Sequence, residues 1–279
     1  MKKILVTGAS GYIGQHLCKL LAEKPEYDVF KLDNFFEEGI DKYRCFEVDI
    51  RKPQEMKNSP MTMHRYDAII HLAALVQVGQ SVQFPTAYYN TNINGTMWLA
   101  RMNNFDKFIF ASTGAAEGLG SPYGISKRVA EDILRELRPN ATIFRFYNVI
   151  GQDGFPPTNP DGLFYNLIKA AEETGEFNLY GTDYDTKDGT CVREYVHVND
   201  ICHSLIEAIE RDSTEIENLA YGDTRTVKEI IELFKSTNNV DFKVNEHPRR
   251  PGDLEACFLE KPSDYMVQRY TYEEMFRYK

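Results

Sequence analysis

Short hydrophobic runs alternate with amphipathic stretches along the first half of the chain. Six runs rich in Val, Ile, Phe and Tyr, bounded by charges or turn residues, have the pattern of buried strands; they are residues 2–8, 27–33, 43–50, 66–74, 107–113 and 141–151. Between them, hydrophobic residues recur at helical spacing in residues 14–24, 88–104 and 126–137. Near-continuous hydrophobic strands that alternate with helices predict an α/β fold with a doubly wound parallel sheet covered on both faces.

The pattern changes after Asn148. Residues 153–162 hold three of the twelve prolines and predict a long irregular connection. After it, the pattern predicts a helix at 163–175 and a strand and helix within 193–212. A capping box from Thr226 to Glu229 precedes another helix. We therefore predict two lobes: residues 1–147 with about 190–212, and a smaller substrate-binding lobe of about 148–189 with 213–279.

Composition and charge narrow the class of protein. The 279 residues are 42% hydrophobic and 27% charged, which is ordinary for a soluble globular protein. A net charge of -10 argues against nucleic acid or an anionic membrane as partner. The five cysteines are scattered without a C-x-x-C pair, and no run of 18 apolar residues occurs. We expect a soluble cytoplasmic protein with reduced thiols. We expect no metal, because the six histidines lack the spacing of metal ligands.

A glycine-rich turn follows the first predicted strand. The stretch "LVTGASGYIG" places Gly8, Gly11 and Gly14 at the start of a helix, where backbone amides and the helix dipole favour a pyrophosphate. Asp33 ends the second strand, 19 residues after Gly14, where an acidic residue bonds the ribose hydroxyls of a dinucleotide. A carboxylate repels a 2′-phosphate, so the pattern predicts a Rossmann-type site for NAD rather than NADP.

A tyrosine and a lysine four residues apart open the helix after the fifth predicted strand. The same spacing occurs at Tyr27/Lys31, within a strand, and at Tyr165/Lys169, on an amphipathic helix. Tyr123 and Lys127 differ because they follow the carboxyl end of a strand, where ligands bind in a doubly wound sheet, and share one helix face.

The chemistry of a tyrosine base explains this pairing. A phenol titrates near 10, so a base near pH 7 needs a shift of roughly 3 units, which a neighbouring ammonium and a cationic nicotinamide both favour. Thr113, at the end of the strand, can hydrogen-bond the same substrate hydroxyl. We therefore predict Thr113, Tyr123 and Lys127 as catalytic residues, the last two also contacting the cofactor.

At this point the chain resembles the extended short-chain dehydrogenase/reductase superfamily, and within it the UDP-glucose 4-epimerase family most closely. The resemblance runs from residue 3 to about 259 and includes "VTGASGYIG", "HLAAL", "SPYGISK" and "FYNVIG". The stretches "YGTDYDTKDGTCVREYVHVND" and "RRPGDLEA" carry it most specifically.

The resemblance implies a set of ligand-binding residues. Those implied for NAD are Gly8, Gly11, Tyr12, Ile13, Gly14, Asp33, Asn34, Asp49, Ile50, Leu72, Ala73, Ala74 and Tyr147. Those implied for the nucleotide sugar are Asn148, Asn178, Leu179, Tyr180, Arg193, Arg250, Asp253 and Cys257. The two arginines suit a diphosphate, and the stretch Leu179–Tyr180 could border a uracil.

The implied activity is NAD-dependent 4-epimerisation of a UDP-hexose through a transient 4-keto sugar, which interconverts UDP-glucose and UDP-galactose. Some relatives have a tyrosine where this chain has Cys257, so we hypothesise that the smaller side chain admits N-acetylated hexoses. A buried cysteine without a substrate role is the alternative. A homodimer built through residues 86–96 and 126–137 is a further expectation from the family.

The chain departs from the family pattern after Thr113. Relatives have a long loop there, whereas nine residues, "GAAEGLGSP", separate Thr113 from Tyr123. The usual Val-Tyr-Gly reads Ala116-Glu117-Gly118. Two other functions remain open: a nucleotide-sugar reductase or dehydrogenase that exchanges NAD with solvent, and a non-catalytic NAD-sensing regulator.

Overall fold

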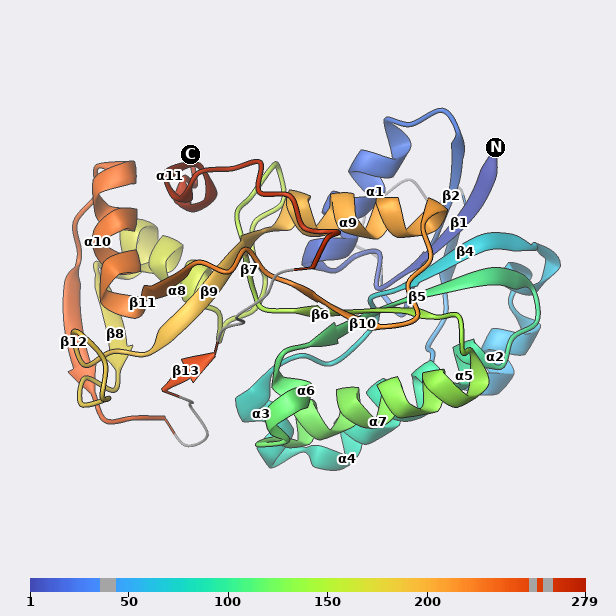
Figure 1. The fold of residues 1–279 in the computed structure, drawn as a ribbon, viewed down its shortest axis with the longest axis horizontal. Coiled ribbons are helices and arrows are strands. Elements are labelled where there is room, and N and C mark those ends of the chain that lie inside the picture. Colours follow the sequence, from blue (N-terminus) through green and yellow to red (C-terminus); the bar gives the residue numbers. More distant parts are fainter. Residues whose placement is uncertain (36–43, 251–254, 258–262) are drawn as a thin grey trace. The chain divides into compact units, whose positions relative to one another are not determined.

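The computed structural model describes residues 1–35, 44–250, 255–257 and 263–279, with backbone alone for Cys257. The chain forms two compact units (Figure 1), residues 1–145 with 202–217, and residues 146–201 with 218–279. The predicted lobes assigned residues 190–201 to the first unit. They group with the second, because the strand at Val192–His197 pairs there with three other strands.

A seven-stranded sheet forms the centre of the first unit, in the order β10-β6-β5-β4-β1-β2-β3. The described strand pairs are parallel, and the predicted Rossmann-like fold is confirmed. The strands are β1 (Lys2–Thr7), β2 (Tyr27–Asp33), β3 (Cys45–Glu47), β4 (Tyr66–His71), β5 (Phe105–Thr113), β6 (Thr142–Phe146) and β10 (Ile216–Leu219). Thr7 lies opposite both Leu32 and His71, and His71 opposite Phe110. The carboxyl ends of four strands therefore lie at one edge.

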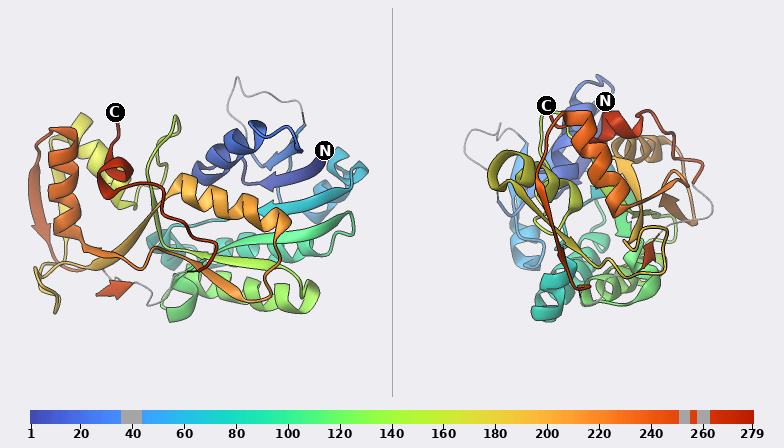
Figure 2. Two further views of the ribbon diagram at one scale, coloured as in Figure 1. Left: turned by 45° about the horizontal axis from the view of Figure 1, so that its top comes forward. Right: turned by 90° about the vertical axis from the view of Figure 1, so that its left-hand side faces the viewer.

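Helices cover both faces of this sheet (Figures 1 and 2). On one face lie α1 (Tyr12–Ala22) and α9 (Val198–Glu210), and on the other α5 (Thr96–Ala100) and α7 (Pro122–Leu137). Leu99 of α5 and Leu134 of α7 are fully buried in one cluster with Leu5, Ile69 and Phe108 of the sheet. This core needs hydrophobic residues on adjacent strands and on one helix face, which is the pattern read from the sequence.

Shorter helices complete the first unit. They are α2 (Pro53–Asn58), the 3-10 helix η1 (Pro60–Met63), α3 (Val78–Gln83), α4 (Pro85–Tyr88), the π-helix η2 (Tyr89–Gly95) and α6 (Ala115–Gly118). The predicted helix at residues 88–104 is thus a continuous run from α4 through η2 to α5, and it ends at Ala100.

The predicted single strand at residues 141–151 is wrong. It is two strands, β6 in the central sheet and β7 (Asn148–Ile150), which pairs in parallel with β9 (Val192–His197). The chain leaves one sheet and joins another at Tyr147. A continuous hydrophobic run does not show such a change of partner, because both strands are buried.

The second unit has its own sheets and core. β9 pairs with β7, with β11 (Thr224–Thr226) and with β13 (Ala256–Cys257), while β8 (Glu176–Tyr180) pairs in parallel with β12 (Lys243–His247). The helices are α8 (Leu163–Lys169), the π-helix η3 (Ala170–Thr174), α10 (Val227–Asn238) and α11 (Tyr272–Phe276). Their buried faces meet in one cluster that includes Phe164, Leu167, Phe234 and Phe276. The predicted capping box is confirmed at the start of α10, where Thr226 and Glu229 bond each other's backbone N–H.

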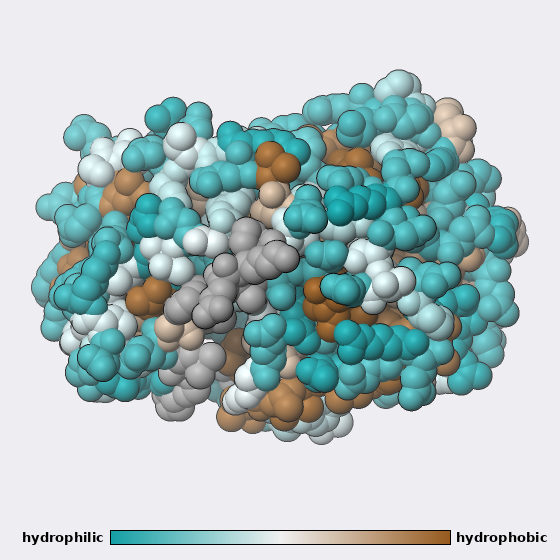
Figure 3. Space-filling view, viewed as in Figure 1, coloured by the Kyte–Doolittle hydropathy of each residue, from teal (hydrophilic) through white to brown (hydrophobic). Residues whose placement is uncertain are grey.

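Exposed hydrophobic side chains gather around α3. Val76, Val78, Val82 and Phe84 are each at least 40% exposed, and Leu119 after α6 is 49% exposed. Figure 3 shows a hydrophobic region at the lower edge of the molecule, over α3 and α6. Among the described residues, no helix is both long enough and apolar enough to cross a membrane.

Candidate active site

The glycine turn after β1 leaves no room for side chains. Gly8 has a positive φ of 70°, and a Cβ there would lie 2.7 Å from the backbone nitrogen of Ala73. A Cβ on Gly14 would lie 2.1 Å from the carbonyl oxygen of Gly8. The turn therefore passes directly against the backbone after β4, and α1 packs directly on the turn. Such a turn exposes its backbone to a ligand, as a pyrophosphate site requires.

The start of α1 is suited to bind an anion. Its N-cap residue, Gly11, provides no side-chain cap, and the first turn has no acidic residue. The backbone N–H groups and the positive end of the helix dipole therefore face the glycine turn without a competing carboxylate. A dinucleotide phosphate bound there would supply the negative charge that this helix end lacks.

Asp33 is held beside the same turn. Its Oδ2 accepts the Ser10 N–H at 2.9 Å and its Oδ1 accepts the Asn34 N–H at 2.8 Å. Burial raises the pKa of Asp33, against these amide hydrogen bonds, which lower it. The predicted ribose-binding carboxylate is thus anchored to the turn that would hold the pyrophosphate, and together these features fit NAD.

The other predicted cofactor residues of the first unit divide into two groups. Leu72 and Ala73 donate their N–H groups to the Thr7 carbonyl and hydroxyl oxygens at 3.1 and 3.3 Å, which fixes their backbone, just before Ala74, against the turn. Tyr12 and Ile13 lie half-buried in the first turn of α1. Ile50, in contrast, is buried in the core, so a cofactor contact there would come from its backbone.

Asp49 carries a partner that sequence reasoning missed. Arg51 donates from Nε to Asp49 Oδ1 at 2.9 Å and from Nη2 to Oδ2 at 2.7 Å. These bonds hold the pKa of Asp49 below its usual range. The spacing Asp-x-Arg was the available signal, since a fork-shaped guanidinium matches a carboxylate two residues away.

The three predicted catalytic residues meet at the end of β5. Thr113 is the last residue of β5, and Tyr123 follows Pro122 at the start of α7, whose N-cap Ser121 accepts the Gly124 N–H at 3.1 Å. The side chain of Thr113 lies close enough to the Tyr123 phenol to lower its pKa. Tyr123 is 9% exposed, and its ring packs edge-to-face with the ring of Tyr88, with the ring centres 6.4 Å apart. Burial raises the pKa of Tyr123 to about 12, while Thr113 opposes the rise.

Lys127 lies one helical turn after Tyr123 and is 3% exposed. Its Nζ lies 4.3 Å from the centre of the Phe110 ring, within range of a cation–π interaction. Burial lowers the pKa of Lys127 to about 7, against the charge of Glu131, which raises it. The phenol therefore keeps its proton in this structure, and added positive charge beside it is what would release that proton.

His71, at the end of β4, is a structural residue. Its Nδ1 bonds the Thr7 hydroxyl at 2.7 Å and its Nε2 bonds the Thr96 hydroxyl at 2.9 Å. Burial, helped by the charge of Lys127, lowers the pKa of His71 to about 3. It stays neutral near pH 7 and joins β4 to β1 and α5.

The two rejected tyrosine–lysine pairs lie where the sequence placed them. Tyr27 and Lys31 are in β2, and the Tyr27 hydroxyl bonds Glu210 at 3.3 Å. Tyr165 and Lys169 are on α8 of the second unit. Neither pair follows the carboxyl end of a strand of the central sheet, so position separates the three pairs as expected.

Four polar or aromatic side chains gather at the ends of β8 and β12 in the second unit. The Tyr180 ring stacks on His247 at 5.2 Å, and the Arg250 guanidinium lies 4.8 Å from the centre of the Tyr180 ring. Asn178 bonds His247 through Oδ1 at 3.0 Å. Sequence reasoning missed His247, although it stands directly before the "PRRPGD" stretch. Leu179 is buried in the core at 2% exposure, so its side chain is not available to a uracil.

The remaining predicted substrate residues lie on or near β9. Asn148 of β7 donates from Nδ2 to the Glu194 carbonyl at 2.9 Å. Arg193 donates from Nη1 to the Val192 carbonyl at 2.8 Å. Cys257 lies opposite Arg193 in the β13–β9 register, and Asp253 is outside the described residues. Tyr147, predicted to contact NAD, belongs to the second unit.

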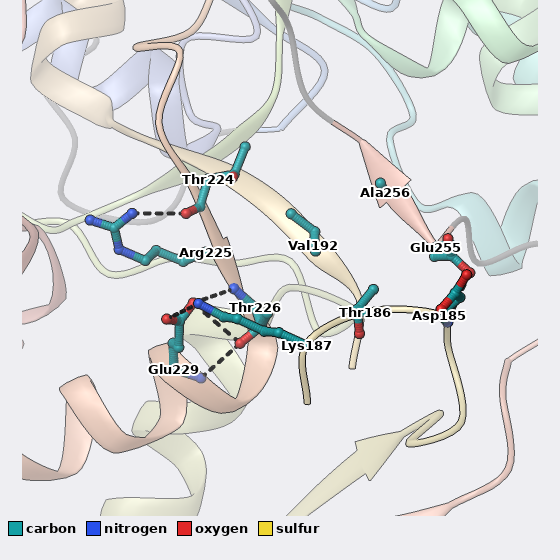
Figure 4. A pocket seen from close by; sticks show the side chains of 10 residues that line it. All are labelled: Asp185, Thr186, Lys187, Val192, Thr224, Arg225, Thr226, Glu229, Glu255 and Ala256. Carbon is teal, nitrogen blue, oxygen red and sulfur yellow. Dashed lines mark hydrogen bonds and ion pairs between the residues drawn. The ribbon is translucent and has the colours of Figure 1, made fainter. Parts of the chain in front are cut away.

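A cavity of about 330 Å³ opens elsewhere in the second unit (Figure 4). Its walls include Lys187 and Arg225 and three carboxylates. Figure 4 shows Lys187, Thr226 and Glu229 pointing toward one another; Lys187 pairs with Glu229, and Arg225 pairs with Asp223. Both cations are thus paired with carboxylates, and the cavity contains none of the predicted sugar-binding residues. It is not the predicted substrate site.

Comparison with known proteins decides the family. Residues 4–222 match the model of the NAD dependent epimerase/dehydratase family. The chain belongs to this family. It is 34% identical to a UDP-glucose 4-epimerase of Rhizobium meliloti over 90% of this chain and 86% of that protein.

Solved structures of epimerases have the same fold. A UDP-glucose 4-epimerase of Bifidobacterium longum in complex with NAD+ and UDP is 28% identical, with a TM-score of 0.88, covering 98% of this chain and 96% of that one. A UDP-Glc/GlcNAc 4-epimerase of Campylobacter jejuni is 29% identical, with a TM-score of 0.80, covering 99% and 97%. The family's cofactor, NAD, agrees with the glycine turn and Asp33.

Replacement of Gly8 tests the cofactor turn. In Gly8→Ala, the new Cβ would press on Ala73 at a positive φ, so we expect the affinity for NAD to fall about tenfold or more. Gly118→Ala is the control, since a Cβ there has no neighbour within 4 Å. Two measurements check this: the amount of cofactor that denaturation releases, and the affinity found by titrating the apoprotein with NAD. Equal affinity for NAD in Gly8→Ala and in wild type would contradict the assignment.

Replacement of Lys127 tests its burial through the pH dependence of stability. Lys127 is charged up to its ordinary pKa of 10.5 when unfolded but only below about 7 when folded. The unfolded state binds more protons between these values, so this lysine makes the free energy of unfolding rise with pH there.

In Lys127→Met we expect a more stable but inactive protein. The gain in unfolding free energy over wild type should be largest below pH 7 and should shrink toward pH 10. The whole decrease should be about 1.4 kcal/mol for each unit by which the pKa of Lys127 is lower in the folded than in the unfolded protein. Urea unfolding at several pH values measures it, with the exposed Lys57→Met as control. A gain that does not change with pH would contradict the buried charge.

Proposed function

We propose that this protein interconverts UDP-glucose and UDP-galactose by inverting C4 of the hexose through a transient 4-keto sugar. One observation carries the proposal: Thr113, Tyr123 and, one turn later, Lys127 lie at the same sheet edge as the glycine turn and Asp33. Tyr123 would then act as a base beside the predicted dinucleotide site, in a member of the NAD dependent epimerase/dehydratase family.

The proposed chemistry assigns a task to each of the three residues. Tyr123 removes the proton of the 4-hydroxyl and later returns one, and Thr113 orients that hydroxyl. The pKa of Tyr123, about 12, has to fall for this task. Positive charge beside the ring, from the Lys127 ammonium and the cationic nicotinamide of bound NAD, would lower it by favouring the phenolate. NAD, which the glycine turn and Asp33 would hold, would supply reversible hydride exchange with C4 on either face of the sugar.

The nucleotide end of the substrate is assigned to the second unit. Arg193 and Arg250 would bind the diphosphate, and Tyr180, Asn178 and His247 would lie beside the nucleoside. This assignment follows from the family resemblance and from the gathering of four of these side chains at the ends of β8 and β12.

Tolerance of N-acetylated hexoses belongs to the same proposal. The chain has Cys257 where some relatives have tyrosine, and the related Campylobacter jejuni enzyme is described as acting on both UDP-Glc and GlcNAc. A smaller side chain at this position would leave space for the 2-acetamido group.

We also propose a cytoplasmic homodimer built through residues 86–96 and 126–137. The exposed hydrophobic residues Val78, Val82 and Phe84 lie on or beside α3, which packs on both of these segments. Burial of this surface in a second copy would remove hydrophobic area from water.

Replacement of Tyr123 tests the function. We expect Tyr123→Phe to lose about 10³-fold in kcat, since it removes the acid–base group, while Tyr165→Phe, from a rejected pair, stays at the wild-type rate. Conversion of UDP-glucose, UDP-galactose and their N-acetylated forms is followed by NMR. Unchanged turnover in Tyr123→Phe would refute the mechanism, and inert N-acetylated sugars would dismiss the role of Cys257.

The fate of the cofactor in the same assay separates the alternatives. An epimerase forms its product without added NAD and without net NADH. NADH formed in proportion to product would identify a dehydrogenase instead, and no conversion of any sugar nucleotide by NAD-loaded protein would favour a regulator.

Light scattering tests the assembly. We expect a particle of twice the chain mass of 32.2 kDa, which Val82→Lys with Phe84→Lys should shift toward monomer. The matched control is Val267→Lys, an exposed hydrophobic position of the second unit. A monomer at all concentrations in the wild type would refute the dimer.

A further inference from the structure

A buried carboxylate lies one helical turn beyond Lys127. Glu131 of α7 is fully buried. Its Oε1 accepts from Arg145 Nε at 2.9 Å and its Oε2 from Arg145 Nη2 at 2.7 Å, a two-point pairing. Ser112 donates its hydroxyl to Oε1 at 2.5 Å. Three donors thus hold one carboxylate, and each comes from a residue of the first unit.

The contacts of Glu131 join the elements that carry the catalytic residues. Ser112 directly precedes Thr113 at the end of β5, and Glu131 is on the helix that carries Tyr123 and Lys127. A buried ion pair by itself is weak evidence of a gain in stability, because desolvation offsets the attraction. Its position between β5 and α7 therefore points to a role in the geometry of the site.

Arg145 also holds the shortened segment after β5. Its Nη1 donates to Glu117 Oε1 at 2.8 Å. Glu117 is in α6, whose Ala115 donates its N–H to the Thr113 hydroxyl oxygen at 3.2 Å. A Cβ on Gly124 would lie 2.4 Å from the Ala115 carbonyl oxygen, so α6 packs directly on α7. The family pattern has tyrosine where this chain has Glu117, so this second ion pair belongs to the short segment.

We propose that Glu131 is a positioning residue. Held by Arg145 and Ser112, it sets the distance between Thr113 on β5 and the turn of α7 that carries Tyr123 and Lys127. Glu117 joins the intervening segment to the same arginine. The proposal rests on the catalytic assignment above. It adds to that assignment a residue that touches neither the substrate nor the cofactor.

Glu131 also acts on the charge of Lys127. The groups around the ammonium are the Phe110 ring of β5, neutral His71 of β4 and Glu131 of its own helix, on which Tyr123 lies one turn earlier. Among them, Glu131 supplies the negative charge that raises the pKa of Lys127 against burial. Without it, Lys127 would lose its proton at lower pH, and with the proton the charge that favours the phenolate.

The test compares three substitutions at or beside this position. In Glu131→Gln, which keeps the shape and removes the charge, we expect kcat to fall about 10- to 100-fold with the UDP-sugar KM within about twofold of wild type. The alkaline limb of the kcat/KM profile should move about one unit to lower pH. Glu131→Asp keeps the charge and shortens the reach, so kcat should fall while that limb stays.

The matched control is Asp132→Asn. Asp132 is the next residue of α7, is exposed, and pairs with Arg128 at 3.4 Å. We expect wild-type kcat, KM and pH profile. The positioning role is refuted if kcat per NAD-loaded site and the pH profile of Glu131→Gln equal those of this control, whatever the melting temperature of the variant. Glu131 would then be a structural residue.

Two further measurements keep the proposal testable. If Glu131→Gln does not fold, Ser112→Ala removes the strand-side contact alone; we expect a several-fold loss of kcat, and unchanged kcat would overturn the proposal. If the wild type turns over no UDP-sugar, the proposed function fails, yet Glu131 remains testable. The pH at which stability begins to rise should be lower in Glu131→Gln than in wild type, and an unmoved onset would refute the influence on Lys127.

Discussion

The parallel register of the central sheet is the constraint on which the site depends. With Thr7 opposite Leu32 and His71, and His71 opposite Phe110, the strands β1, β2, β4 and β5 end at one edge. The residues that follow each end, from Gly8 to Thr113, therefore come together although they are far apart in the sequence. His71 strengthens the alignment through its bonds to Thr7 and Thr96. This is the general reason that ligands bind at the carboxyl ends of such sheets.

Burial at this edge favours the neutral forms of the predicted catalytic groups. Tyr123 and Lys127 have little contact with water. Burial raises the pKa of Tyr123 and lowers the pKa of Lys127, so it favours the neutral form of each. A charge in such surroundings interacts strongly with the groups nearby, because the local dielectric constant is low. Lys127 and Glu131 are thus coupled with little solvent screening, and added positive charge acts strongly on the phenol.

The alternation of hydrophobic runs was enough to predict the central parallel sheet without its strand β10, and the longer helices α1 and α7; the glycine turn followed from its own motif. These elements are long and strongly patterned, and Gly8, Asp33 and Tyr123 stand at recognisable points of the strand–turn–helix order. The second unit was harder. The exchange of sheets at Tyr147, the pairing of β8 with β12 and the place of β9 all depend on strand partners, and a hydrophobic run does not specify its partner.

The candidate site divides in the same way. Residue type and order by themselves determined that a glycine turn, a carboxylate at the end of β2 and a tyrosine–lysine pair are present. They also predicted phosphate, ribose and catalytic roles for these groups, because each role needs a specific chemistry at a fixed local spacing. Only the tertiary structure decided what surrounds them. It buried Leu179 and Ile50 in cores, gave Asp49 the partner Arg51 and brought His247 to Tyr180. It also placed Arg145 between Glu131 and Glu117, which are 14 and 28 residues away in the sequence. Contacts between distant residues arise from packing, and packing depends on all the elements at once.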